Sequence, residues 1–188
     1  MRTRLTAEQL EAREVPALTI QFDFSFDTSG FFTDPTRRAV LQQAANDLTA
    51  RIDTSLAAVV PGGGNTWTLR FVNPTTGVTA TVPNAAIAAD ALLVYVGGRD
   101  LPGTTVGVTA SGTSSASGSA AWQSLLRNRA PTGSSSWGAS VAFDSRSNWF
   151  FGSSAAGSGG AKWTSTRSRS TNSGTPWASA RRRGGRVR

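Results

Sequence analysis

The chain has 188 residues and a formal charge of +8, and it contains neither cysteine nor histidine. The missing cysteine excludes disulfides and thiolate chemistry, and the missing histidine excludes a Ser-His-Asp triad and the usual zinc ligand. Residues 161–188 hold eight of the 19 basic residues and no Asp or Glu, so the other 11 balance the 11 acidic residues. A polyanionic partner is therefore suggested by the C-terminal segment alone.

Residues 1–16 form the first predicted unit. Thr6 and Gln9 match a capping box, which predicts a short helix. The sequence from Arg4 to Arg13 resembles an N-terminal segment of many large exported bacterial surface proteins, although no apolar stretch typical of a signal peptide follows it. This resemblance implies an export-related segment and a protein that is exported or held at the cell surface.

The first half of the body predicts a strand, a long helix and a second strand. Apolar and polar residues alternate from Leu18 to Phe26, as in a half-buried strand. Asp34 and Pro35 are typical of a helix start, and helical spacing continues to about Val59. The apolar face of this helix would consist of Leu41, Ala45, Leu48, Ile52 and Leu56. Residues 67–71 alternate again, and a helical crossover would make the two strands parallel neighbours.

The second half predicts further strands and a long loop. Residues 78–82 read as a short strand after a turn, and the apolar run 91–96 reads as an interior strand covered on both faces. That run is too short to span a bilayer, so no transmembrane segment is expected. Residues 97–119 read as a Gly/Ser/Thr-rich loop that contains a weak edge strand at 104–110. A short helix around Trp122 and a last strand at 137–144 complete the order.

These elements predict an α+β fold with a mixed, twisted sheet and one long helix. The folded unit would be residues 17–152. Residues 153–188 are rich in Ser, Thr, Gly and Arg, and we expect them to form a disordered basic tail.

The body carries few acidic residues that could serve a catalytic pair. The sequence spacing of the acidic residues favours no carboxylate pair for glycoside hydrolysis. Structural positions in turns and at strand edges are therefore expected for Asp23, Asp27, Asp90, Asp100 and Asp144. Gly62, Gly63 and Gly64 follow a predicted helix rather than precede one, so they cannot hold a phosphate at a helix start. No catalytic residue is predicted.

The last predicted strand carries a family resemblance. The segment from Trp137 to Trp149 looks like the one before the zinc helix of metzincin-type peptidases, and Phe143 and Trp149 keep the matrixin spacing. The closest likeness is to exported bacterial metallopeptidases, whose bodies share Asn65-Thr66-Trp67, Val94-Tyr95-Val96-Gly97 and Asn148-Trp149-Phe150-Phe151-Gly152. The match extends over roughly residues 18–152 and contains no single diagnostic motif.

This resemblance implies the upper half of a metzincin-like catalytic domain. Intact relatives would be zinc endopeptidases that bind an extended protein or peptide substrate along an edge strand, here Thr104, Val106, Val108 and Ala110. The motif His-Glu-x-x-His should follow Phe151 by a short loop, but this chain contains no histidine. No catalytic, metal-binding or cofactor-binding residue is therefore expected in this chain.

A second reading frame accounts for the missing motif. Translation between Trp163 and Ala180 can be shifted so that each new codon begins at the third base of an original codon. The codons compatible with the protein sequence then permit the translation Asp-Phe-Tyr-Ser-Val-Ala-Ile-His-Glu-Phe-Gly-His-Ala-Leu-Gly-Phe-Gly. This string has the two histidines and the glutamate of a zinc helix. We therefore expect a frameshift near residues 153–162, with the tail as its out-of-frame product.

The leading functional hypothesis is an inactive, frameshifted and truncated fragment of a metallopeptidase-like protein. One alternative is a polyanion- or nucleic-acid-binding protein that contacts phosphates through Arg181, Arg182, Arg183, Arg186 and Arg188. Another alternative is a surface or adhesive module, which the Ser/Thr/Gly-rich composition and the export-like start would suit.

Overall fold

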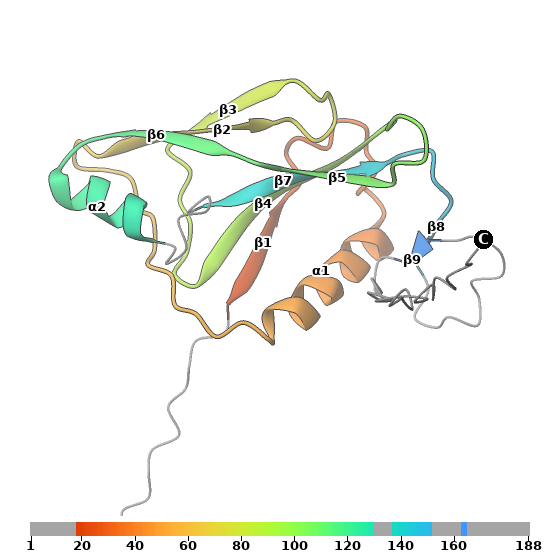
Figure 1. Cartoon of the computed structure of the whole chain (residues 1–188), viewed down its shortest axis with the longest axis horizontal. Coiled ribbons are helices and arrows are strands. Elements are labelled where there is room, and N and C mark those ends of the chain that lie inside the picture. The colour runs from red at the N-terminus through yellow and green to blue at the C-terminus, as the bar shows by residue number, and fades with distance from the viewer. Residues whose placement is uncertain (1–17, 130–136, 152–162, 165–188) are drawn as a thin grey trace, which may run out of the picture.

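The computed structural model describes residues 18–129, 137–151 and 163–164 (Figure 1). Over these residues the protein is a mixed α+β fold with two helices and open sheets. The elements in chain order are β1 (Thr19–Asp23), α1 (Pro35–Thr49), β2 (Thr66–Val72), β3 (Thr79–Pro83), β4 (Ala91–Arg99), β5 (Gly107–Ser111), β6 (Thr113–Ser117), α2 (Ala120–Asn128), β7 (Gly138–Asp144), β8 (Trp149–Phe150) and β9 (Trp163–Thr164).

The main sheet is four-stranded and mixed, with the order β1-β4-β7-β5. Strands β1 and β7 run parallel to β4, whereas β5 is antiparallel to β7. A second, antiparallel sheet has the order β3-β2-β6, and β8 pairs with β9. The prediction of an interior strand at residues 91–96 is confirmed, because β4 lies between two neighbours.

The predicted parallel pairing of the first two strands is wrong. Strand β1 pairs with β4, and β2 belongs to the second sheet. The residues after α1 give the reason: Val59 forms an isolated bridge with Ile87, so this segment leads the chain to the other layer before β2 begins. The helix nevertheless packs against β1, as the crossover argument required.

Apolar side chains form one core on each face of the main sheet. Leu93 and Tyr95 of β4 point towards the second sheet, where they pack with Trp67, Phe71 and Trp137. The opposite face, which α1 covers in part, carries a second cluster around Phe31, Phe32 and Val96. Its partly buried members are Phe22, Phe24, Leu41, Val94, Val141, Phe143, Trp149 and Phe151.

The helix α1 ends ten residues before the predicted end at Val59. After Thr49 the backbone forms tight turns, and Leu48 and Ile52 of the predicted apolar face are exposed. Leu56 is buried in another way: its backbone N–H donates to the Asp90 carboxylate and its carbonyl accepts from the Asp90 N–H. Pairing with the chain before β4 therefore competes successfully with the helix, helped by the four weak helix formers at residues 52–55.

The strand β1 is also shorter than its alternating pattern. The chain turns after Asp23, whose carboxylate accepts a hydrogen bond from the N–H of Ser25. This turn sends Phe24 and Phe26 to different cores: Phe24 packs on Phe32, and Phe26 packs edge-on against Phe71. The alternating residues after Asp23 therefore belong to a turn and not to the strand.

Residues 97–119 are not the predicted loop. Strand β4 continues to Arg99, and β5 and β6 follow. Gly97 and Gly98 fall in the predicted loop, but they allow close packing inside β4. A Cβ atom on Gly98 would lie 2.4 Å from the Cβ of Phe31, and one on Gly97 would lie 2.7 Å from Oγ1 of Thr75.

Other predictions are confirmed by the structure. Strand β3 and helix α2 occupy the expected positions, with Ser119 as the N-cap of α2, and β7 matches the last strand. The predicted helix in residues 1–16 lies outside the described residues, as does the tail 153–188 apart from β9. Among the residues that the structure describes, no helix is long and apolar enough to cross a membrane.

Candidate functional site

The main sheet has two edge strands, β1 and β5, and the candidate site is the edge formed by β5. Strand β5 pairs with β7 on one side, and over the described residues no strand pairs with it on the other side. Four of its five residues are exposed, and the fifth, Ala110, is half-buried. The predicted edge strand at residues 104–110 is thus present, although it begins at Gly107 and ends at Ser111.

The register shows which backbone groups of β5 are free. The N–H of Asp144 donates to the carbonyl of Val106 at 2.8 Å, so these two residues form a hydrogen-bonded pair. Bonded and non-bonded pairs alternate along an antiparallel ladder, so Val108 and Ala110 also direct their backbone groups to β7. The N–H and C=O groups of the residues between them point away from β7: Gly107, Thr109 and Ser111.

The residues named for the substrate edge therefore need revision. Thr104 and Val106 precede β5, and Val106 uses its carbonyl within the sheet. An added strand would bond to Gly107 and Thr109 instead, because the end of β5 approaches β2. The sequence contains no signal for this alternation, because it depends on the pairing with β7.

Strand β7 ends beside the start of this edge in a turn that Asp144 organises. Its carboxylate accepts hydrogen bonds from the N–H of Leu101 at 3.0 Å and from the hydroxyl of Ser147 at 2.5 Å. Its carbonyl accepts from the indole N–H of Trp149 at 2.7 Å. An open cavity of about 460 Å³ lies next to this turn, and the ion pair between Asp100 and Arg146 lines it. Both members of that pair are exposed, so it contributes little stability.

These hydrogen bonds, led by the one from Ser147 and followed by the one from Leu101, lower the pKa of Asp144 from its usual value. A lowered folded-state pKa gives stability that is present above the unfolded value and is lost as the pH falls towards the folded one. We expect Asp144→Asn to be less stable than the wild type at pH 7, and the difference to shrink below about pH 4. Urea unfolding at both pH values measures this.

Asp53→Asn, at an exposed position of the same chain, is the matched control and should change stability little at either pH. If the difference in unfolding free energy between the wild type and Asp144→Asn stayed the same at both pH values, the lowered pKa of Asp144 would be contradicted.

The other acidic candidates also bind backbone groups. Asp27 accepts from the N–H groups of Phe32 at 2.6 Å and Gly98 at 3.1 Å, and Asp90 accepts from Leu56 at 2.7 Å. Such carboxylates fix loops, which supports the expected structural roles. Over the described residues, no group of three acidic side chains is placed to hold a metal ion.

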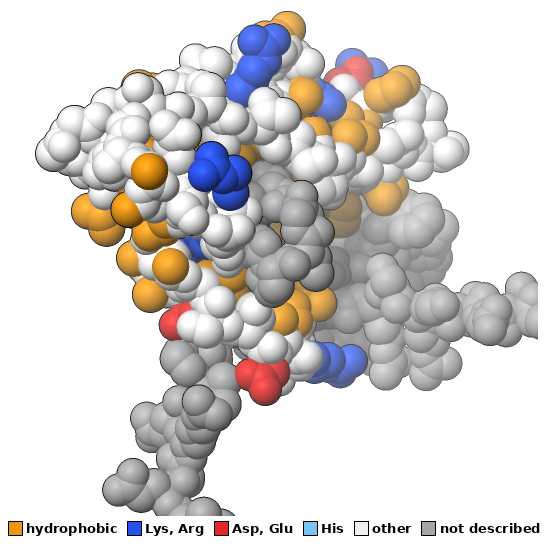
Figure 2. Space-filling model, turned by 60° about the vertical axis from the view of Figure 1, so that its left-hand side comes forward, with side chains coloured by type: hydrophobic (Ala, Val, Ile, Leu, Met, Phe, Trp, Pro, Cys, Tyr) orange, Lys and Arg blue, Asp and Glu red, His pale blue; other side chains and the backbone are white. Residues whose placement is uncertain are grey.

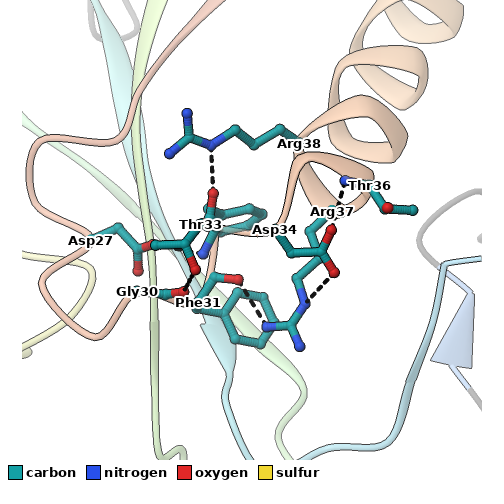
Figure 3. Close-up of polar contacts among 9 residues, drawn as sticks. Asp27, Gly30, Phe31, Thr33, Asp34, Thr36, Arg37 and Arg38 are labelled. Atoms are coloured by element: carbon teal, nitrogen blue, oxygen red, sulfur yellow. Dashed lines mark hydrogen bonds and ion pairs between the residues drawn. The ribbon is translucent and has the colours of Figure 1, made fainter.

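The loop before α1 is fixed by a second polar cluster (Figure 3). Asp34 caps the helix by accepting from the N–H of Thr36 at 2.8 Å. Arg37 donates to the carbonyl of Phe31 at 2.8 Å and lies over its ring, and Arg38 donates to the carbonyl of Phe32. In Figure 3 the two guanidinium groups point in different directions, so they do not converge on one anion.

Zinc is the metal that the family resemblance implies. The chain has no histidine and no cysteine, and the five acidic candidates already bind backbone amides, a hydroxyl group or an arginine. The residues present therefore do not fit a zinc ion, and no step of hydrolysis can be assigned to them.

Comparisons with known proteins give no relative for this chain. No protein-family model, no curated protein and no solved structure matches it. The candidate site therefore rests on its own geometry.

Proposed function

We propose that this chain is the peptide-binding part of a metalloendopeptidase-like domain, and that it does not cleave peptides. The observation that carries the proposal is the second reading frame of residues 163–180, which permits a complete zinc helix shortly after β8. The protein sequence fixes the first two bases of each codon except at the seven Ser and Arg residues, which allow two choices, so a chance match over such a string is improbable. The metzincin-like assignment is part of this proposal.

The geometry of β5 supports the peptide-binding part of the proposal. An extended peptide can add a strand to an exposed sheet edge, where backbone hydrogen bonds give affinity. Gly107 and Thr109 offer two N–H and two C=O groups on this edge, whereas the end of β5 approaches β2, with which the following β6 pairs. Their side chains are small and uncharged, so another backbone can approach closely.

Thr109→Pro tests this edge without disturbing the sheet. Proline removes the outward N–H of residue 109, which β7 does not use, and its ring obstructs a neighbouring strand. We expect about tenfold weaker binding of an extended peptide, because one hydrogen bond is lost and steric obstruction is added. The probe is a labelled peptide of alternating threonine and valine, measured by fluorescence anisotropy. It has no charge, so the basic tail does not attract it.

The matched control is Thr109→Val, which keeps the N–H and should bind as tightly as the wild type. Circular dichroism confirms that both variants keep their sheet. Equal affinity of Thr109→Pro and Thr109→Val for the probe would rule out strand addition at β5.

The reading-frame part of the proposal has its own test. Sequencing the gene across codons 153–180 should reveal His-Glu-x-x-His in the other frame, and the purified chain should bind no stoichiometric zinc. A second frame without that motif would disprove the proposed origin. The polyanion alternative depends on Arg181–Arg188, which lie outside the described residues, and no described contact favours it.

A further inference from the structure

The outer face of the second sheet carries an array of hydroxyl groups. In β2 the buried residues Trp67, Leu69 and Phe71 point inward, so the residues between them point outward. The register extends this outer face to both neighbouring strands. Its seven hydroxyl side chains are Thr66, Thr68, Thr79, Thr81, Thr113, Ser115 and Ser117.

Arg70 lies at the centre of this hydroxyl face. The register pairs it with Thr81 of β3 on one side and with Thr113 of β6 on the other. Directly opposite residues have Cβ atoms about 5 Å apart, so both hydroxyl groups lie within reach of a ligand held by the guanidinium group. All three side chains are exposed.

The polar groups of this hydroxyl face have no partner within the described part of the chain. None of the seven hydroxyl groups forms a side-chain hydrogen bond there, and the guanidinium group of Arg70 forms no ion pair or hydrogen bond with another described residue. The strand positions on the face include no Asp or Glu that could neutralise Arg70. Figure 2 shows how sparse charged side chains are on the described surface in that view.

We propose that this hydroxyl face binds an acidic polysaccharide whose sugars carry carboxylates, such as a polymer of uronic acid. The guanidinium group of Arg70 would bind one carboxylate through two parallel hydrogen bonds. The hydroxyl groups around it would donate to and accept from the sugar hydroxyls, since each can do both. An extended array suits a repeating polymer, whose weak contacts add along the chain.

The charge of the face favours this polymer over nucleic acid. A nucleic acid strand carries one phosphate per roughly 3.4 Å and requires several cations along its path. The hydroxyl face offers a single arginine among seven neutral hydroxyl groups. A polymer with carboxylates separated by neutral hydroxyls is the better complement.

The test uses the full chain and polygalacturonate, with binding measured by calorimetry at about 0.15 M salt, where weak long-range attraction to the tail is screened. We expect Arg70→Gln to bind about tenfold more weakly. Thr81→Val with Thr113→Val should bind about threefold more weakly at unchanged charge. Arg127→Gln, which removes an exposed charge from α2, should bind like the wild type.

Three outcomes would overturn the proposal. Equal losses in Arg70→Gln and Arg127→Gln would mean that only net charge matters. Tighter binding of heparin or of single-stranded DNA than of polygalacturonate through Arg70 would mean that the partner is wrong. Unchanged binding in the threonine variant would mean that the hydroxyl groups play no part. Unfolding curves of each variant confirm that the fold is kept.

Discussion

Replacing Arg129 by methionine should lower the free energy of unfolding by about 2–3 kcal/mol, because backbone carbonyls lose the hydrogen bonds of a charged donor. Arg129 is only 3% exposed, and its guanidinium donates to three backbone carbonyls. The distances are 2.6 Å to Ala57, 3.2 Å to Ala88 and 2.7 Å to Ala91. One side chain thus joins the end of α2 to the segment after α1 and to the start of β4.

The pKa of Arg129 shows the cost of this arrangement. Burial lowers it from the ordinary value, and the nearby Asp90 partly opposes this effect. Since arginine stays charged in proteins, the lowered pKa means that the folded state holds a desolvated cation, which the carbonyls must compensate. Methionine has a similar length but no donor, so the carbonyl of the buried Ala91 would lose its charged donor, as would the carbonyls of Ala57 and Ala88 nearer the surface.

Urea denaturation followed by far-ultraviolet circular dichroism measures the effect. Arg127→Met, at an exposed position two residues earlier, is the matched control and should cost little. Arg129→Lys should recover only part of the loss, because an ammonium group lacks the planar fork. A change of less than about 1 kcal/mol in Arg129→Met would show that the carbonyls find other partners.

Periodic patterns in the sequence predicted most individual elements. The alternation at residues 67–71, the apolar run at 91–96 and the strand before Asp144 each correspond to a strand. These patterns depend on local geometry, which a short window of sequence contains. Asp34 with Pro35 marked the start of α1 for the same reason.

Long-range pairing decided the features that sequence patterns missed. The end of α1 depends on Asp90, which is 34 residues away from Leu56 and bonds to its backbone. In the sequence, Arg129 looks like a solvated charge at the end of a short helix. Its binding partners cannot be recognised locally, because the carbonyls that it binds lie 38 to 72 residues earlier. Gly97 and Gly98 resemble loop residues until Pro74 and Phe31 are placed against them.

The candidate site was predicted only in part, for a related reason. Composition indicated an edge strand near residues 104–110, and the structure places β5 there. Which of its backbone groups are free depends on the bond between Val106 and Asp144, which no sequence window contains. The hydroxyl face around Arg70 likewise arises only when β3 and β6 pair with β2.

Restoring the second reading frame should convert this chain into a zinc-binding peptidase. A gene repaired near codons 153–162 would encode Asp-Phe-Tyr-Ser-Val-Ala-Ile-His-Glu-Phe-Gly-His after β8, in place of the sequence that begins with β9. We expect the repaired protein to bind zinc stoichiometrically and to hydrolyse unfolded casein in a chelator-sensitive reaction. The present chain should do neither, because it has no histidine.

The repaired protein also provides the sharpest controls for this prediction. Replacing the glutamate of the restored motif by glutamine should leave zinc binding intact and slow hydrolysis roughly 10²–10⁴-fold, the usual contribution of a general base. The partly buried apolar face beside α1, which includes Val94, Val141 and Phe143, should bind less hydrophobic dye once a helix packs on it. Failure of the repaired protein to bind zinc would refute the metallopeptidase assignment, whereas zinc binding without casein cleavage would refute only the predicted activity on that substrate.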